Sequence, residues 1–170
     1  MSAAHAFPSI PAKILLPIDF SPASQAAMEM ASDLAGHFHA ELYLLNVIPM
    51  FPTTSLPDLV PETTFIEEAR AYAEHHLAKC KTALAAKGIR STSCVEVGND
   101  IVGTIMNVVE REHVDMIVIS THGLSGWHPL VFGSIAEKVI KLAQCPLLLL
   151  HAAQPEDGVK ATTNRASEWW

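Results

Sequence analysis

Cysteine is scarce in this sequence, and positive charge is never clustered. The three cysteines, Cys80, Cys94 and Cys145, are widely spaced and form no C-x-x-C pair. This spacing excludes a disulfide framework and a zinc site, and it indicates buried thiols in a protein of a reducing compartment. Lys and Arg total 11 against 18 Asp and Glu, a net charge of −7. We therefore expect no nucleic-acid partner, because contacts to phosphates need clustered cations.

Long apolar runs are missing as well. No run approaches the roughly 18 residues that span a bilayer, and residues 1–11 have neither the basic start nor the apolar segment of a signal peptide. We therefore expect a cytoplasmic chain with no membrane partner. Hydrophobic residues make up 49% of the 170 and charged residues 17%. Such a chain is too apolar for disorder and is typical of one globular domain with a large core.

Short apolar segments alternate with amphipathic ones along the chain. The apolar segments predict five buried strands, namely Lys13–Ile18, Leu42–Ile48, Ser93–Val97, Met116–Ile119 and Pro146–Leu150. Cap and stop residues predict four helices. The first runs from Ser21-Pro22 to Gly36, and the second runs from Thr64, which forms a capping box with Glu67, to Gly88. The third is capped by Asn99 or Asp100, and the fourth begins near Ser134. Phe65 and Tyr72 are expected on the apolar face of the second helix. The expected inner face of the third helix holds Val102, Ile105, Met106 and Val109, and the last helix carries Ile135, Val139, Ile140 and Leu142.

Strands that are apolar throughout and separated by helices are typical of a parallel sheet covered on both faces. With right-handed crossovers, this order predicts an α/β fold with an open, doubly wound, five-stranded parallel sheet. We expect the domain to span residues 12–151, between an N-terminal extension (1–11) and a flexible C-terminal tail (152–170). The tail ends in Trp169-Trp170, which either docks on a partner or frays.

The carboxyl ends of the strands are where chemistry is expected, because ligands of open parallel sheets bind where the strand order reverses. Three strand ends are candidates, namely Pro17-Ile18-Asp19, Val47-Ile48 and Ser120 to Gly123. The last leads to Gly133-Ser134, where N–H groups and a hydroxyl at a helix start form an anion site. No Walker motif occurs, and no G-x-G-x-x-G follows the first strand. Spacing alone therefore leaves a plain strand-to-helix connection equally open.

Several motifs together resemble one family. The series Ser120-x2-Gly123-x9-Gly133-Ser134 is similar to the G-x2-G-x9-G-[ST] signature of ATP-binding universal stress proteins. The opening Lys13 to Ser21 and the closing Ala136–Ile140 and Cys145–Leu147 also resemble that family, over roughly residues 12–151. The resemblance implies a Rossmann-like sheet of order 3-2-1-4-5 with ATP across the ends of the first and fourth strands. It also implies a homodimer through the last strand, whose apolar edge is a liability unless it is paired.

The resemblance assigns roles to individual residues. It implies that Pro17, Ile18 and Asp19 lie beside adenine and ribose, with Asp19 accepting from the ribose hydroxyls or assisting magnesium. The remaining implied contacts are Val47 to adenine, Ser120, Gly123, Gly133 and Ser134 around the ribose and phosphates, and Ile119 and Ile135 at the rim. Asp19 is also explained as a turn or cap residue. His122 either donates to phosphate or faces solvent. Ser120 replaces the family's usual glycine, and we expect it to be tolerated.

Turnover of ATP is not expected. Fast phosphoryl transfer needs cations on the developing charge, and Arg111 is the only Lys or Arg between Gly98 and Gly133. The sequence therefore predicts a stress-response regulator that binds ATP with slow or no hydrolysis, and it identifies no protein partner. The alternative is a dimeric interaction protein of the same family that has lost nucleotide binding. An adenylating enzyme of the ATP-pyrophosphatase type is a distant third, because the SGGxDS motif is absent after the first strand.

Overall fold

The computed structural model describes residues 10–50, 62–121 and 133–151. Strands and helices alternate along the chain, as the apolar pattern predicts. Their order is β1 (Lys13–Pro17), α1 (Pro22–Phe38), β2 (Glu41–Pro49), α2 (Glu62–Ala86), β3 (Ser91–Gly98), α3 (Ile101–Arg111), β4 (Met116–Ser120), α4 (Ser134–Leu142) and β5 (Leu147–Leu150). The C-terminal tail lies outside the described residues, as does the N-terminal extension except for Ile10 and Pro11.

The five strands form one parallel sheet of order β3-β2-β1-β4-β5. Both the fold class and the predicted strand order are therefore confirmed. β1 lies in the middle, with Leu15 in register with Tyr43 of β2 on one side and with Ile117 of β4 on the other. The chain winds outward from β1 in one direction through β2 and β3, and then in the other through β4 and β5. The order thus reverses between β1 and β4, at the point where open sheets bind ligands.

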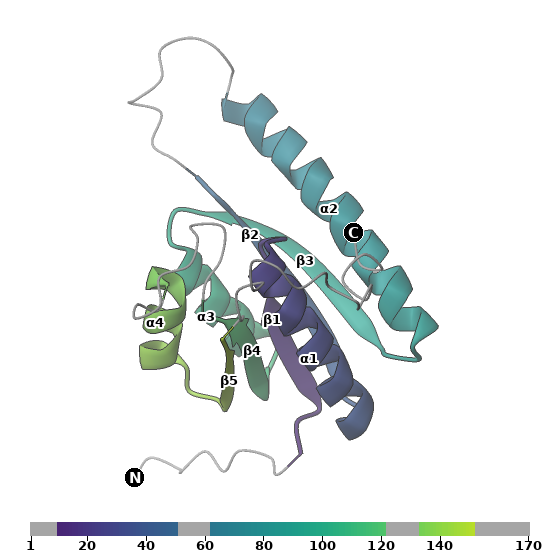
Figure 1. Ribbon diagram of the computed structural model, residues 1–170. Coiled ribbons are helices and arrows are strands. Elements are labelled where there is room, and N and C mark those ends of the chain that lie inside the picture. Colours follow the sequence, from purple (N-terminus) through teal and green to yellow (C-terminus); the bar gives the residue numbers. More distant parts are fainter. Residues whose placement is uncertain (1–9, 51–61, 122–132, 152–170) are drawn as a thin grey trace, which may run out of the picture.

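Successive residues of the central strands face opposite sides of the sheet, which explains why the strands are apolar throughout. Ile14 and Leu16 of β1 pack in a core with α1 and α2, whereas Leu15 packs in a second core with α3 and α4. All three side chains are fully buried. Figure 1 shows the corresponding layers, with α1 and α2 on one face of the sheet and α3 and α4 on the other.

Two helix starts follow the sequence closely. Ser21 is the N-cap of α1, where its hydroxyl accepts from the N–H of Ser24 at 3.2 Å and Pro22 occupies the first turn. Asp100 is the N-cap of α3 and accepts from the N–H of Gly103 at 3.0 Å. These side chains satisfy donors that an uncapped helix start leaves without partners.

Other boundaries differ from the sequence-based prediction. Gly36 lies inside α1 rather than ending it, and the helix stops at His39, which adopts a left-handed conformation with φ +56°. The backbone N–H of Ala40 bonds back to the carbonyl of Ala35 at 3.0 Å, so a short C-terminal turn is built without glycine. The capping box at Thr64 is wrong, because α2 already begins at Glu62. Gly88 does follow the end of α2, with φ +74°.

Two side chains expected on the apolar, covered face of α2 are exposed instead. Phe65 and Tyr72 of α2 are 51% and 57% exposed. On α4, Ala136 and Val139 form the buried face, while Ile135, Ile140 and Leu142 are exposed. The buried face of α4 therefore includes fewer of its apolar residues than the helix contains. Within the described ranges, no helix is both long enough and apolar enough to cross a bilayer.

Candidate functional site

A cavity of about 480 Å³ opens at the carboxyl end of the sheet. Its volume lies within the range of small-molecule sites, about 300–1,000 Å³. Nine of the residues singled out in the sequence line it together, namely Pro17, Ile18, Asp19, Val47, Ile119, Ser120, Gly133, Ser134 and Ile135. They come from the ends of β1, β2 and β4 and from the start of α4, so four separate segments of the chain converge on one space. The other two predicted site residues, His122 and Gly123, lie outside the described residues.

The end of β1 is fixed by its neighbour β2. The N–H of Ile18 donates to the carbonyl of Leu45 at 2.8 Å. In the other direction, the side-chain amide of Asn46 donates to the carbonyl of Ile18 at 2.8 Å, and Asn46 is only 8% exposed. Both backbone groups of Ile18 are therefore satisfied at the point where the strand ends. The main chain that leads to Asp19 consequently leaves the sheet in a defined direction.

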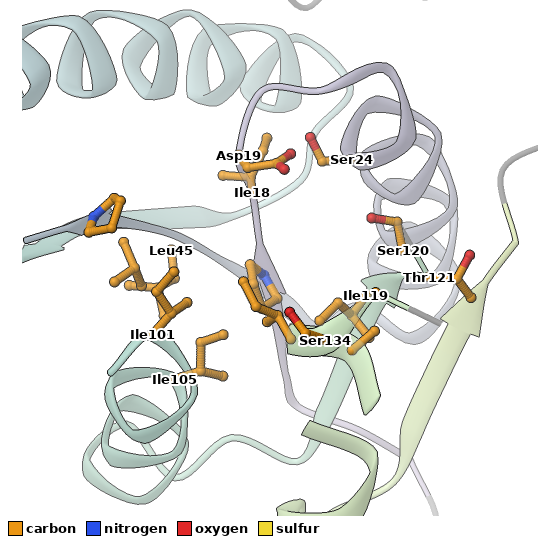
Figure 2. A pocket seen from close by; sticks show the side chains of 16 residues that line it. Ile18, Asp19, Ser24, Leu45, Ile101, Ile105, Ile119, Ser120, Thr121 and Ser134 are labelled. Carbon is orange, nitrogen blue, oxygen red and sulfur yellow. The ribbon is translucent and has the colours of Figure 1, made fainter. Parts of the chain in front are cut away.

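Asp19 has a structural partner and also lines the cavity. Its Oδ1 accepts from the N–H of Ser21 at 3.0 Å and from the Ser21 hydroxyl at 2.6 Å. The carboxylate therefore stabilises the turn between β1 and α1. This is the turn role that the sequence also allowed for Asp19. Figure 2 shows the same carboxylate beside Ser24 at the edge of the cavity. Asp19 therefore both stabilises the turn and lines the cavity.

The start of α4 closes the opposite side. Gly133 is its N-cap, and no side chain caps this helix start in the part of the chain that the structure describes. The N–H of Gly133 donates to the carbonyl of Thr121 at 2.8 Å, so this amide is already used and joins the end of β4 to the start of α4. The next amides, from Ser134 onward, begin the helix and carry the positive end of its dipole. An anion in the cavity would face them.

The cavity has an apolar end and a hydroxyl-rich end. Ile101 and Ile105 of α3 lie on one side in Figure 2, while Ser120 and Thr121 lie on the other. Ser134 lies between them in this view. Among the described lining residues, Asp19 is the only charged one, and none is Lys, Arg or His. The described lining can therefore bury an apolar group at one end and form neutral hydrogen bonds at the other.

Several residues that line the cavity were not among the predicted site residues, namely Ser24, Leu45, Pro49, Ile101, Ile105, Thr121 and Ala136. Ile101 and Ile105 are the clearest case, because Ile105 was predicted only on the inner face of this helix and Ile101 had no predicted role. Their spacing of four residues does place them on one side of α3. However, only the packing of α3 against the sheet shows that this side reaches the cavity.

The cation between Gly98 and Gly133, Arg111, is engaged elsewhere. Its guanidinium pairs with Glu96 at 2.9 Å and with Glu112 at 3.2 Å, and it is not among the residues that line the cavity. The Arg111 hydrogen bond holds the pKa of the Glu96 carboxyl below its usual value. Arg111 therefore belongs to a surface ion pair, and the structure places it away from the candidate site.

None of the three cysteines is among the residues that line the cavity. Burial raises the pKa of the Cys80 thiol to about 11 and also raises the pKa of Cys94 and of Cys145. Thiols with raised pKa values stay protonated at neutral pH and are poor nucleophiles. Within residues 10–50, 62–121 and 133–151, no cluster of three or more His, Cys, Asp or Glu side chains is placed to hold a metal ion.

Comparison with known proteins identifies the family. The sequence model of the universal stress protein family matches residues 12–151. The chain belongs to the universal stress protein family. Universal stress protein MJ0531 of Methanocaldococcus jannaschii is 31% identical over 147 residues, which cover 85% of this chain and 84% of that protein. Universal stress protein YxiE of Bacillus subtilis is 32% identical over 146 residues, or 81% of this chain and 97% of YxiE.

Solved structures share the fold. Hypothetical protein MJ0577 has a TM-score of 0.73 at 26% identity, covering 84% of this chain and 97% of its own. A universal stress protein family member from Arabidopsis thaliana with AMP bound has a TM-score of 0.61 at 17% identity, covering 89% and 97%. One from Archaeoglobus fulgidus in complex with dAMP has a TM-score of 0.58 at 18% identity, covering 81% and 95%. Another, in complex with cAMP, has a TM-score of 0.55 at 20% identity, covering 84% and 98%.

Proposed function

We propose that this universal stress protein binds an adenine nucleotide, ATP in the first place, in the cavity between the ends of β1 and β4. The observation that carries the proposal is the convergence of nine sequence-predicted residues on one cavity at the point of strand-order reversal. The relatives solved with AMP, dAMP and cAMP support an adenine nucleotide as the ligand class.

The two ends of the cavity fit the two ends of a nucleotide. Leu45, Ile101 and Ile105 offer apolar surface to a base, and burying a flat aromatic ring there is favourable. The ribose then lies near Asp19, whose carboxylate accepts hydrogen bonds from hydroxyls. The phosphates lie against Ser134 and the amides at the start of α4, where the helix dipole favours negative charge. Magnesium, where it accompanies ATP, would contact Asp19 and the phosphates.

Slow or absent hydrolysis is part of the proposal. The described lining holds no Lys or Arg that could neutralise charge on a transferring phosphoryl group, and such a cation is a main source of rate in phosphoryl transfer. We therefore propose a regulator whose nucleotide-bound state is the signal, rather than an enzyme. Steady-state phosphate release from purified protein should not exceed that of a Gly133→Val variant. Release well above the variant would contradict this part of the proposal.

The identity of the nucleotide is tested on purified protein. Denaturing the protein releases what it has bound, and mass analysis of the released fraction should show ATP, or ADP and AMP derived from it. A Gly133→Val sample prepared in parallel should release much less. Equal amounts from both samples would mean that the nucleotide sits elsewhere, and no nucleotide in either would favour the alternative, a dimeric protein without nucleotide binding.

We also propose a homodimer through β5. β5 forms one edge of the described sheet, and each residue from Leu147 to Leu150 is only half-buried in the single chain. The carbonyl of Pro146 accepts from the N–H of Ile117 in β4, and the carbonyl of Leu150 accepts from the N–H of Thr121, directly after β4. In a parallel ladder, alternate residues bond to the same neighbour, so the amide of Leu149 faces the free edge. A second copy of the chain would satisfy that edge and cover its side chains.

The dimer is tested with a pair of variants at one position. Leu149→Pro removes the outward-facing donor, whereas Leu149→Ala keeps it and shortens the side chain by a similar amount. Light scattering at micromolar concentration should give a dimer mass for the wild type and for Leu149→Ala, and a monomer mass for Leu149→Pro. A monomeric wild type would contradict the proposed assembly.

A further inference from the structure

The turn from β1 to α1 contains a strained residue. Phe20, between Asp19 and the N-cap Ser21, has φ +62°. This is the left-handed region, which bulky side chains rarely adopt because the Cβ atom approaches the backbone. Such residues persist only where the surroundings hold them, and they gather at ligand sites. Phe20 directly follows Asp19, which lines the cavity, so contacts that hold Phe20 also act on the position of Asp19.

Two side chains of α2 pack against Phe20. The Phe20 and Tyr72 ring centroids are 5.9 Å apart at an interplanar angle of 81°, an edge-to-face contact, and those of Phe20 and His76 are 5.3 Å apart. Tyr72 and His76 are four residues apart on α2, and their own centroids are 4.2 Å apart. Edge-to-face contacts between aromatic rings are favourable beyond the area that they bury. The exposed Tyr72 thus has a defined contact although it lies outside the core.

The turn is therefore held from both sides of Asp19. On the β2 side, Asn46 donates to the carbonyl of Ile18 at 2.8 Å. On the α2 side, Tyr72 and His76 pack on Phe20. Between them, Asp19 bonds to the N–H and hydroxyl of Ser21. A change in the Phe20 backbone would rotate the peptide that joins it to Asp19 and would displace the carboxylate from the cavity.

We propose that Tyr72 and His76 are positioning residues of the nucleotide site, which hold Phe20 in its left-handed conformation and so present Asp19 to the ribose. The inference rests on the proposed function and adds α2 to the elements that determine nucleotide affinity. Tyr72 is 57% exposed, so a ligand that pulled its ring away from Phe20 would weaken nucleotide binding, and nucleotide would weaken the binding of that ligand by the same factor.

Substitutions of Phe20 test whether the ring offsets backbone strain. Glycine adopts φ +62° freely, whereas alanine does not. Nucleotide affinity should therefore fall in the order wild type, Phe20→Gly, Phe20→Ala, with the alanine variant weaker than the glycine variant by a factor on the order of tenfold. In a loop without this strain the glycine variant should bind no better than the alanine variant, because the extra backbone freedom of glycine must be lost when nucleotide orders the turn. An alanine variant that binds as well as or better than the glycine variant overturns the inference.

Substitutions on α2 test the positioning of Asp19 directly. The readout is the ratio of affinities for ATP and 2′,3′-dideoxy-ATP, because only ATP offers ribose hydroxyls to Asp19. Tyr72→Ala should lower this ratio by roughly fivefold, as expected for the loss of one aromatic contact, while Tyr72→Phe should keep it. Phe65→Ala is the matched control, since Phe65 is an exposed aromatic residue of α2 with no ring contact among the described residues. An equal loss for both nucleotides, or a fall in the control, overturns the inference.

A measurement without nucleotide separates the two proposals. The Ser21 N–H is bonded to Asp19, so its hydrogen exchange reports whether the turn is closed. Exchange at Ser21 should be faster in Tyr72→Ala than in the wild type and in Phe65→Ala. Unchanged exchange overturns the positioning role even if the wild type binds ATP. A wild type that binds no adenine nucleotide overturns the proposed function, whatever the exchange shows.

Discussion

At the scale of single residues, the candidate site depends on small and neutral groups. Asp19 is the only charged residue among the described lining, and the other polar side chains there are the hydroxyls of Ser24, Ser120, Thr121 and Ser134. Hydroxyls and amides form weaker contacts to phosphate than Arg or Lys do. Affinity in such a site depends on available space and on backbone donors. Substitutions that change volume should therefore matter more than those that change charge.

Gly133→Val tests the space beside the start of α4. Gly133 has φ −57° and ψ 143°, a conformation open to every residue, so the variant adds bulk without backbone strain. Its isopropyl group would extend into the region proposed for the phosphates. We expect ATP affinity to fall at least about tenfold, or about 1.4 kcal/mol, while the thermal midpoint changes little. If the variant binds ATP as tightly as the wild type does, the phosphates do not lie in this part of the cavity.

Ser32→Ala should stabilise the protein. The Ser32 hydroxyl is buried in α1, at 1% exposure, and has no hydrogen-bond partner in the part of the chain that is described. Burial without a partner costs roughly 1–3 kcal/mol, so its removal should raise the free energy of unfolding in urea by about 1 kcal/mol. Ser24→Ala is the control with the opposite sign, because the equally buried Ser24 hydroxyl donates to the carbonyl of Ser21 at 2.9 Å. A destabilised Ser32→Ala would show that the hydroxyl does have a partner.

At the scale of elements, the caps of α1 and α3 are expected to differ in what they support. Both Ser21 and Asp100 accept a backbone N–H at a helix start, and loss of either cap should cost about 1 kcal/mol of stability. The Ser21 hydroxyl also donates to Asp19. Ser21→Ala should therefore weaken both stability and ATP binding, whereas Asp100→Ala should weaken stability alone. Urea denaturation and ATP titration of both variants check this, and equal affinities would argue against a role of the turn in binding.

The contact between α2 and the turn should depend on pH. Burial lowers the pKa of His76, and the neighbouring Lys79 and His75 lower it further. A base whose pKa is depressed in the folded state is stabilising while it is neutral, above its unfolded pKa of about 6.5, and this stability is lost as the pH falls through the folded value. The wild type should therefore lose more stability between pH 7 and pH 5 than His76→Gln does. Parallel losses in the two proteins would contradict this.

At the scale of the whole molecule, local and periodic features could be predicted from the sequence. The parallel sheet follows from strands that are apolar on both faces, and the caps Ser21 and Asp100 follow from their types and positions. The convergence of the ends of β1 and β4 with α4 follows from the rule for open sheets. The family resemblance supplied the strand order, which the chain's own pattern does not determine.

What could not be predicted rests on contacts between distant residues. The Asp115 carboxylate accepts from the N–H groups of Ala12 and Lys13, more than 100 residues earlier in the chain. Tyr72 has the spacing of a core residue but packs on the turn that holds Phe20. Local sequence also could not predict that α1 continues past Gly36. A glycine destabilises a helix by only about 1 kcal/mol, and tertiary packing can outweigh that cost.

Above all, we propose that a cavity at the start of α4, lined by hydroxyls and by no described cation, binds the phosphates of ATP. Calorimetric titration of magnesium-ATP into nucleotide-stripped protein tests it most directly. We expect saturable heat at one ATP per chain, with an affinity that changes little between low and moderate salt, because no described lining residue is a cation. No heat of binding, or binding that collapses as salt is added, would contradict it.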